Sequence, residues 1–130
     1  MSNSINFKKE INDEFERVIE RVTARLKDSG FGILTRIDMH TKIESGIGKK
    51  IPKLAILGAC NPTMAFEAVE RNSDVSSLLP CNAVVREIGP NRMSVEIAKP
   101  SSLMKILGDS KLDELALKAD ELLAAALEKV

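Results

Sequence analysis

Ile56-Leu57-Gly58-Ala59-Cys60-Asn61-Pro62 is the stretch of this 130-residue chain from which its organisation follows. The run at residues 54–57 is apolar without interruption, which is typical of a strand buried in a sheet. Asn61 is a good helix N-cap residue and Pro62 fits the first helical position. The stretch therefore predicts a buried strand that passes directly into a helix, which we expect to end near Arg71.

A second motif, Leu79-Pro80-Cys81-Asn82, repeats part of the first, and the two motifs hold the only cysteines of the chain. Both place a thiol before an amide that can cap backbone groups, beside a proline that stiffens the backbone. Cys60 also precedes a helix N-terminus, where the N–H groups and the helix dipole favour a thiolate or an anionic ligand. The pair predicts one site, formed by Cys60, Asn61, Pro62, Cys81 and Asn82.

Alternating or helical spacing of apolar residues predicts most other elements. The predicted strands cover about residues 5–11, 31–37, 81–88 and 93–97, and the predicted helices cover about residues 13–28, 103–107 and a long final segment after residue 110. Asp13 with Glu16, and Ser110 with Asp113, have the spacing of helix capping boxes. No regular element is predicted for residues 38–50.

The final helix carries a broad apolar stripe, which we interpret as a packing face. Leu123 and Leu127 widen the stripe, and a contact between subunits is the alternative use of these positions. Spacing alone does not separate the two uses.

Composition limits the classes of function. With 44% hydrophobic and 29% charged residues, the chain has the composition of a single folded domain, residues 1–130. Its 19 basic and 19 acidic residues balance, and it has no Trp or Tyr, which argues against nucleic-acid binding. Neither a signal peptide nor a membrane span is predicted, so we expect a cytoplasmic protein with reduced cysteines.

The glycine-rich segment Gly46-Ile47-Gly48-Lys49-Lys50 does not form a phosphate-binding motif. Ile43 stands where the first glycine of a P-loop belongs, and Lys50 stands where Ser or Thr is required. Ile51 likewise replaces the third glycine of a dinucleotide-binding fingerprint. The segment is interpreted as a flexible basic turn.

Three hypotheses for the paired cysteines remain open. They form a structural or ligand-binding pocket, they face each other for thiol redox or sulfur chemistry, or they bind a metal together with His40. Carboxylates are a weaker candidate for acid/base chemistry, and they occur in two pairs, Glu67 with Glu70 and Glu87 with Glu96. No complete catalytic set is recognised, so whether the chain is an enzyme stays undecided.

The two cysteine motifs, with Gly30-Phe31-Gly32 and Pro100-Ser101-Ser102-Leu103-Met104, resemble the prokaryotic family catalogued as domain of unknown function 302. This resemblance implies a small α+β domain of TATA-binding-protein-like arrangement, with the order strand, helix, four strands, helix. It also implies a homodimer and no established activity. The sequence departs from the family at two positions. Lys53 stands where an aromatic residue is common, and Lys99 stands where an acidic residue is common.

Together these observations predict an antiparallel sheet packed on helices, with an extra helix after Pro62. The favoured function is a homodimeric small-ligand-binding module without a cofactor or metal, whose site lies at the two Cys-Asn motifs. Thiol redox or sulfur handling by Cys60 and Cys81 is the alternative function.

Overall fold

Five strands form one antiparallel sheet in the computed structural model, which describes residues 5–130. The strand order across the sheet is β1-β5-β4-β3-β2, so β1 and β2 are the two edges. The strands are β1 (Asn6–Ile11), β2 (Gly32–Asp38), β3 (Leu54–Cys60), β4 (Cys81–Gly89) and β5 (Arg92–Ala98). The predicted hairpin is confirmed, because β4 and β5 are consecutive antiparallel neighbours.

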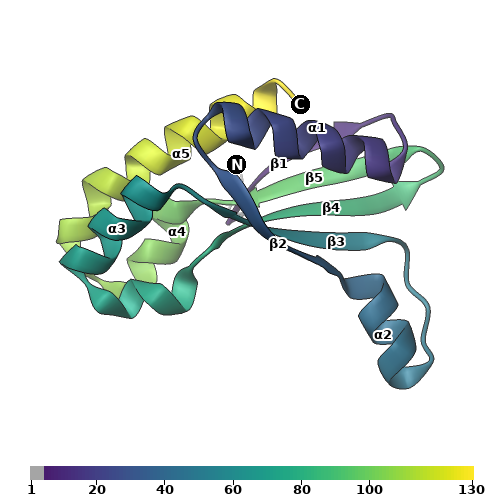
Figure 1. The fold of residues 1–130 in the computed structure, drawn as a ribbon, viewed down its shortest axis with the longest axis horizontal. Coiled ribbons are helices and arrows are strands. Elements are labelled where there is room, and N and C mark those ends of the chain that lie inside the picture. The colour runs from purple at the N-terminus through teal and green to yellow at the C-terminus, as the bar shows by residue number, and fades with distance from the viewer. Residues whose placement is uncertain (1–4) are drawn as a thin grey trace.

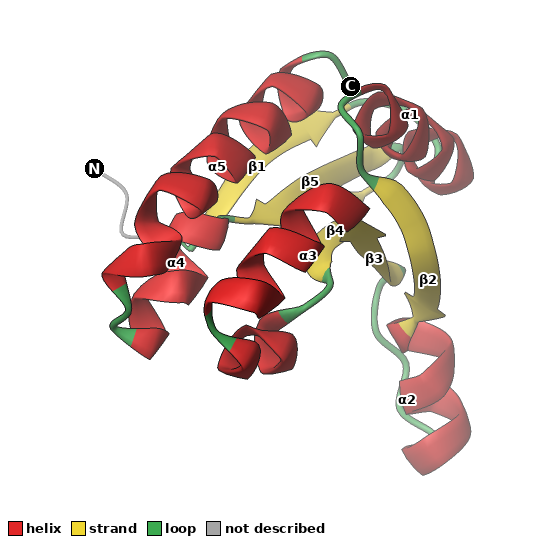
Figure 2. Ribbon diagram, turned by 60° about the vertical axis from the view of Figure 1, so that its left-hand side comes forward, coloured by secondary structure: helices red, strands yellow, loops and turns green. Residues whose placement is uncertain are grey.

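Helices cover one face and one end of this sheet. They are α1 (Phe15–Asp28), α2 (Met39–Ile47), α3 (Pro62–Arg71), α4 (Pro100–Met104) and α5 (Asp113–Glu128). Figures 1 and 2 show α1 and α5 along the same face of the sheet, and α3 and α4 gathered beyond one end of it. Strand β1, helix α1, strands β2 to β5 and helix α5 follow one another in the predicted order. The predicted α+β fold is therefore confirmed.

The main hydrophobic core lies between the sheet and helices α1 and α5. Alternate residues of the central strands point towards these helices, as the period of a β-strand requires. Leu57, Val85 and Val95 from the sheet, with Val22 and Leu123 from the helices, are all at most 1% exposed.

A second, smaller core lies beyond the end of the sheet. It includes Ala68 of α3, Val75 of a 3₁₀ turn, Met104 of α4 and Leu115 of α5. Met64 packs against both cores. Helix α5 contributes to both as well, so it spans the boundary between them.

The apolar stripe of α5 is a packing face, as predicted. Leu123 and Leu127, the two positions that could have served a subunit contact, are 0% and 5% exposed and belong to the main core of this chain. Packing within the chain therefore accounts for them.

Helix α2 is the element that the sequence does not predict. Its only apolar residues, Met39, Ile43 and Ile47, form a short row four residues apart, and none of its residues is buried, so this row does not pack against the rest of the chain. Figures 1 and 2 both show it projecting away from the rest of the chain. Gly48 ends the helix in a left-handed conformation at φ 69°, and Nδ1 of His40 accepts a hydrogen bond from the Leu54 N–H at 3.0 Å. The prediction of a turn over residues 46–50 is therefore wrong for Gly46 and Ile47, which belong to α2.

Two predicted helix caps are wrong. Asp13 accepts from the N–H of Glu14 at 2.8 Å, one residue before α1, and Glu16 pairs with Arg36 instead of closing a capping box. At the other end of the chain, Asp109 rather than Ser110 caps the turn before α5. Two possible capping residues stand next to each other at both places, Asp13 with Glu14 and Asp109 with Ser110, and their spacing does not say which one caps.

The short helix after β5 also differs from its predicted position. It begins at Pro100, with proline in the first turn, and a 3₁₀ turn at Lys105–Leu107 follows it. Proline suits this place because its fixed φ is that of a helix and its missing N–H is not needed there. No described helix is long and apolar enough to cross a membrane.

The sheet face opposite α1 and α5 has a mixed apolar and charged surface. Register pairs Ile37 with Ile56, Ile56 with Val84, and Val84 with Glu96, so these side chains form one row across four strands. Burial acts to raise the pKa of Glu96, but hydrogen bonds from Arg86 and Ser94 outweigh it and lower the pKa below its usual range. No helix among residues 5–130 runs along this face (Figure 1).

Gly58 is the tightest position in the sheet. A Cβ atom there would overlap Oγ1 of Thr35 and lie 2.8 Å from Cγ of Pro80. The absence of a side chain therefore lets β2 and the segment before β4 close over β3.

We expect Gly58→Ala to lower the free energy of unfolding by about 1–3 kcal/mol, because the added methyl group meets a proline ring that has little freedom to move. Urea unfolding followed by circular dichroism measures the change. Gly32→Ala is the matched control, since nothing lies within 4 Å of a Cβ at this other strand glycine. Equal stability of the two variants would contradict the steric account.

Candidate functional site

The two cysteine motifs lie side by side at one end of the sheet. Strand β3 ends at Cys60 and β4 begins at Cys81, and the register pairs Ala59 with Cys81 and Gly58 with Asn82. The antiparallel pairing of these two strands therefore brings together segments that are separate in the sequence.

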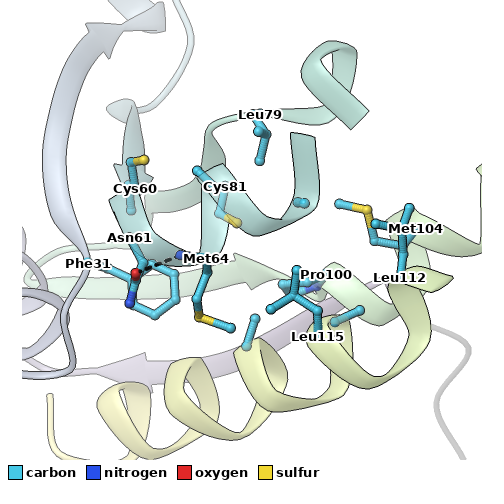
Figure 3. A pocket seen from close by; sticks show the side chains of 15 residues that line it. Phe31, Cys60, Asn61, Met64, Leu79, Cys81, Pro100, Met104, Leu112 and Leu115 are labelled. Carbon is cyan, nitrogen blue, oxygen red and sulfur yellow. Dashed lines mark hydrogen bonds between the residues drawn. The ribbon is translucent and has the colours of Figure 1, made fainter. Parts of the chain in front are cut away.

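Asn61 joins three segments of the backbone. Its Oδ1 accepts a hydrogen bond from the N–H of Met64 at 3.1 Å, drawn as a dashed line in Figure 3, and this confirms the predicted N-cap of α3. Its Nδ2 lies over Gly30, where a Cβ atom would be only 3.0 Å away. Gly30 has a φ of 91°, which favours glycine in any case. Asn61 thus positions both the start of α3 and the turn between α1 and β2.

A partly enclosed cavity of about 50 Å³ lies beside the motifs, between α3, α4 and α5 (Figure 3). Cys60, Asn61 and Cys81 contribute to its wall, whereas Pro62 and Asn82 do not. The larger apolar side chains of the wall come from segments far apart in the chain: Phe31, Met64, Leu79, Met104, Leu112 and Leu115. The sequence does not reveal this wall, because in each segment these residues have only the spacing of ordinary core residues.

Cys81 is an uncharged thiol at neutral pH. Burial raises its pKa to about 11, and the nearby Cys60 and Asp120 add to the rise. A thiol with this pKa holds its proton well above the neutral range and is a poor nucleophile.

The two thiols do not face each other as the redox hypothesis requires. Cys81 shares a face of the sheet with its partner Ala59, and Cys60, the next residue of β3, points to the opposite face. In Figure 3 the Cys81 sulfur points towards the other lining side chains, and the Cys60 sulfur is turned away from them. Both cysteines are free. Diverging Cβ directions do not permit a disulfide without movement of the backbone.

His40 does not join the cysteines in a metal site. It bonds to Leu54 at the first residue of β3, whereas Cys60 is the last residue of that strand, about 20 Å away at the rise of an extended strand. Residues 5–130 contain no cluster of three or more His, Cys, Asp or Glu side chains that could hold a metal ion. The metal hypothesis for these three residues is therefore wrong.

The paired carboxylates and the two unusual lysines also lie outside the cavity wall. None of Glu67, Glu70, Glu87 and Glu96 contributes to it. The ammonium group of Lys53 lies 5.6 Å from the ring centre of Phe15, and that of Lys99 lies 5.1 Å from the ring centre of Phe7. These lysines interact with aromatic faces and do not line the cavity.

We expect Cys81 to resist alkylation at pH 8, at a rate about 100-fold below that of an ordinary exposed thiol, because so little thiolate is present. Its rate should rise as the pH approaches 11, where the thiol loses its proton. Iodoacetamide labelling with peptide mass mapping measures each cysteine separately in the folded protein, and unfolded protein is the control. Rapid labelling of Cys81 at pH 8 under native conditions would contradict the raised pKa.

Comparison with known proteins agrees with this architecture. No curated protein matches the chain. Among solved structures, an uncharacterized conserved protein DUF302 from Bacillus stearothermophilus is 28% identical, covers 96% of this chain and 97% of its own, and superposes with a TM-score of 0.89. The family model described as domain of unknown function DUF302 matches residues 7–130. The resemblance seen in the motifs is therefore confirmed, and the chain belongs to the DUF302 family.

Proposed function

We propose that this chain is a small-ligand-binding module whose site is the cavity beside the two Cys-Asn motifs. One observation carries the proposal: Cys60, Asn61 and Cys81 come from two strands and a helix start, and all three line one partly enclosed cavity. A concave, mostly apolar site with few polar groups is typical of small-molecule binding.

The alternative, thiol redox or sulfur handling, has weaker support. It needs a thiolate and a second thiol within reach of it. Cys81 keeps its proton and Cys60 points to the other face of the sheet, so neither requirement is met by the pair. Binding needs only the shape and chemistry of the wall.

We further propose that the module is a homodimer formed through the sheet face opposite α1 and α5. The row of Ile37, Ile56 and Val84 gives this face an apolar strip that no helix of residues 5–130 covers. Lys8 and Glu96 continue the row with both signs of charge. Glu96 is only 8% exposed and is already paired with Arg86 within the chain, so the apolar strip is the part of this face that a second copy would cover.

Native mass spectrometry of the gently purified, untagged protein tests the binding proposal. We expect added mass on the wild-type chain, and at least a tenfold lower retained fraction in Asn61→Ala, because that change opens the wall at the start of α3. Asn82→Ala is the matched control, since Asn82 has the same chemistry in the second motif but lies outside the cavity wall. An absence of added mass, or equal retention in Asn61→Ala and wild type, would refute the proposal.

Sedimentation velocity tests the dimer separately. We expect wild type to sediment as a dimer and Val84→Glu to shift it towards monomer by at least tenfold in dissociation constant, because a new carboxylate would be desolvated in the apolar row. Phe66→Glu is the control, as Phe66 is 65% exposed on α3, away from this face. A wild-type monomer at micromolar concentration would refute the dimer and leave the binding proposal intact.

A further inference from the structure

The cavity lies at the boundary between the two hydrophobic cores. Its wall includes Phe31 and Ala59 of the main core and Met104, Leu112 and Leu115 of the second core. Met64 lines it and packs against both.

The wall offers a ligand almost no polar partner. Apart from Asn61, no lining side chain carries a nitrogen or oxygen atom, and of the two cysteines only Cys81 turns its thiol towards the other lining side chains (Figure 3). Asn61 already accepts from Met64, and its amide nitrogen faces Gly30. No buried side-chain nitrogen or oxygen atom in the described part of the chain lacks a hydrogen-bond partner. No polar group of a ligand is therefore needed to complete the site.

The wall also opposes a charged ligand. It contains no Lys, Arg or His side chain that could neutralise a carboxylate or phosphate. An anion moved from water into such a place would lose its hydration without a counter-charge. The burial that keeps the Cys81 thiol protonated would act on the anion in the same way.

Size sets a further limit. The volume of about 50 Å³ is well below that of a 150 Å³ apolar cavity that accepts benzene in another protein. Met64 and Met104 are unbranched and adaptable, so rotation of their side chains can enlarge the space. A thin aliphatic chain fits these dimensions better than a planar ring.

From these observations we infer, on the basis of the proposed function, that the cavity binds an uncharged aliphatic group: a short-chain apolar molecule or the aliphatic end of a larger one. This wall does not suit the anionic ligand that the N-terminus of α3 suggested. The apolar group lies against Met64 and Met104, and any polar part of the ligand stays beside Asn61, the one lining side chain with a nitrogen or oxygen atom.

Methyl NMR of protein labelled with ¹³C at the methionine methyl groups tests the ligand class. Xenon and 1-hexanol are the apolar probes, and inorganic phosphate is the anionic probe. We expect saturable shifts of Met64 and Met104 with both apolar probes and none with phosphate. Met93, which is buried in the main core and does not line the cavity, should stay unchanged.

A cavity-filling variant provides the control. Ala116→Leu places a larger side chain in the wall and should weaken the xenon and 1-hexanol responses at least tenfold, whereas Ala24→Leu on the exposed side of α1 should leave them unchanged. If Ala116→Leu does not fold, Ala68→Val fills the same cavity with a smaller change.

The outcomes separate this inference from the proposed function. Shifts with phosphate alone, or no shift with either apolar probe, would overturn the aliphatic ligand. A charged retained molecule that is lost in Asn61→Ala would also overturn it, while the binding function would stand. Saturable apolar binding in a protein that is purified without any retained mass would support the aliphatic site and count against the proposed function.

Discussion

The close approach at Gly58 is the constraint on which the rest of the site depends. Thr35 from β2 and Pro80 from the segment before β4 both occupy the space that a side chain at this position would take. A side chain at Gly58 would push these segments apart, so the glycine allows the close pairing in which Ala59 lies opposite Cys81. That pairing is what brings the two cysteine motifs to one end of the sheet. Asn61 over Gly30 fixes the adjoining turn in a similar way.

The cavity follows from the way α5 serves two cores. Its first turns pack in the second core through Leu115 and Ala116, and its later turns pack in the main core through Leu123 and Ala126. Small residues such as Ala119 lie where the helix passes from one to the other, and they leave space that larger side chains would fill. An empty apolar cavity of about 50 Å³ destabilises a fold by about 1 kcal/mol. An apolar guest that restores the missing dispersion contacts would recover part of that free energy.

The sequence predicted best what is decided by neighbouring residues. Asn61 and Pro62 start α3 because a capping amide and a fixed φ act within one turn of the chain. Helix α2 was missed because its apolar row is only three residues long and it contains Gly46, which is a poor helix former. The caps at Asp13 and Ser110 were wrong because several acceptors of similar chemistry stand next to one another, and tertiary packing chooses among them. The antiparallel pairing of β3 with β4 follows from contacts between distant segments, which spacing does not record.

The cavity wall also depends on contacts between distant segments, so the sequence does not predict it. The wall changes the ligand chemistry inferred for the site. The start of α3 seen alone favours an anion, because free N–H groups and the helix dipole gather there. In the folded chain Asn61 takes the Met64 N–H, and side chains from five other segments surround the motif with carbon and sulfur. A helix dipole contributes about 1 kcal/mol to the binding of a charge, whereas removing an unpaired charge from water costs several times more. The apolar surroundings therefore outweigh the local dipole, and the chemistry of the ligand is set by residues that lie far from the motif in the sequence.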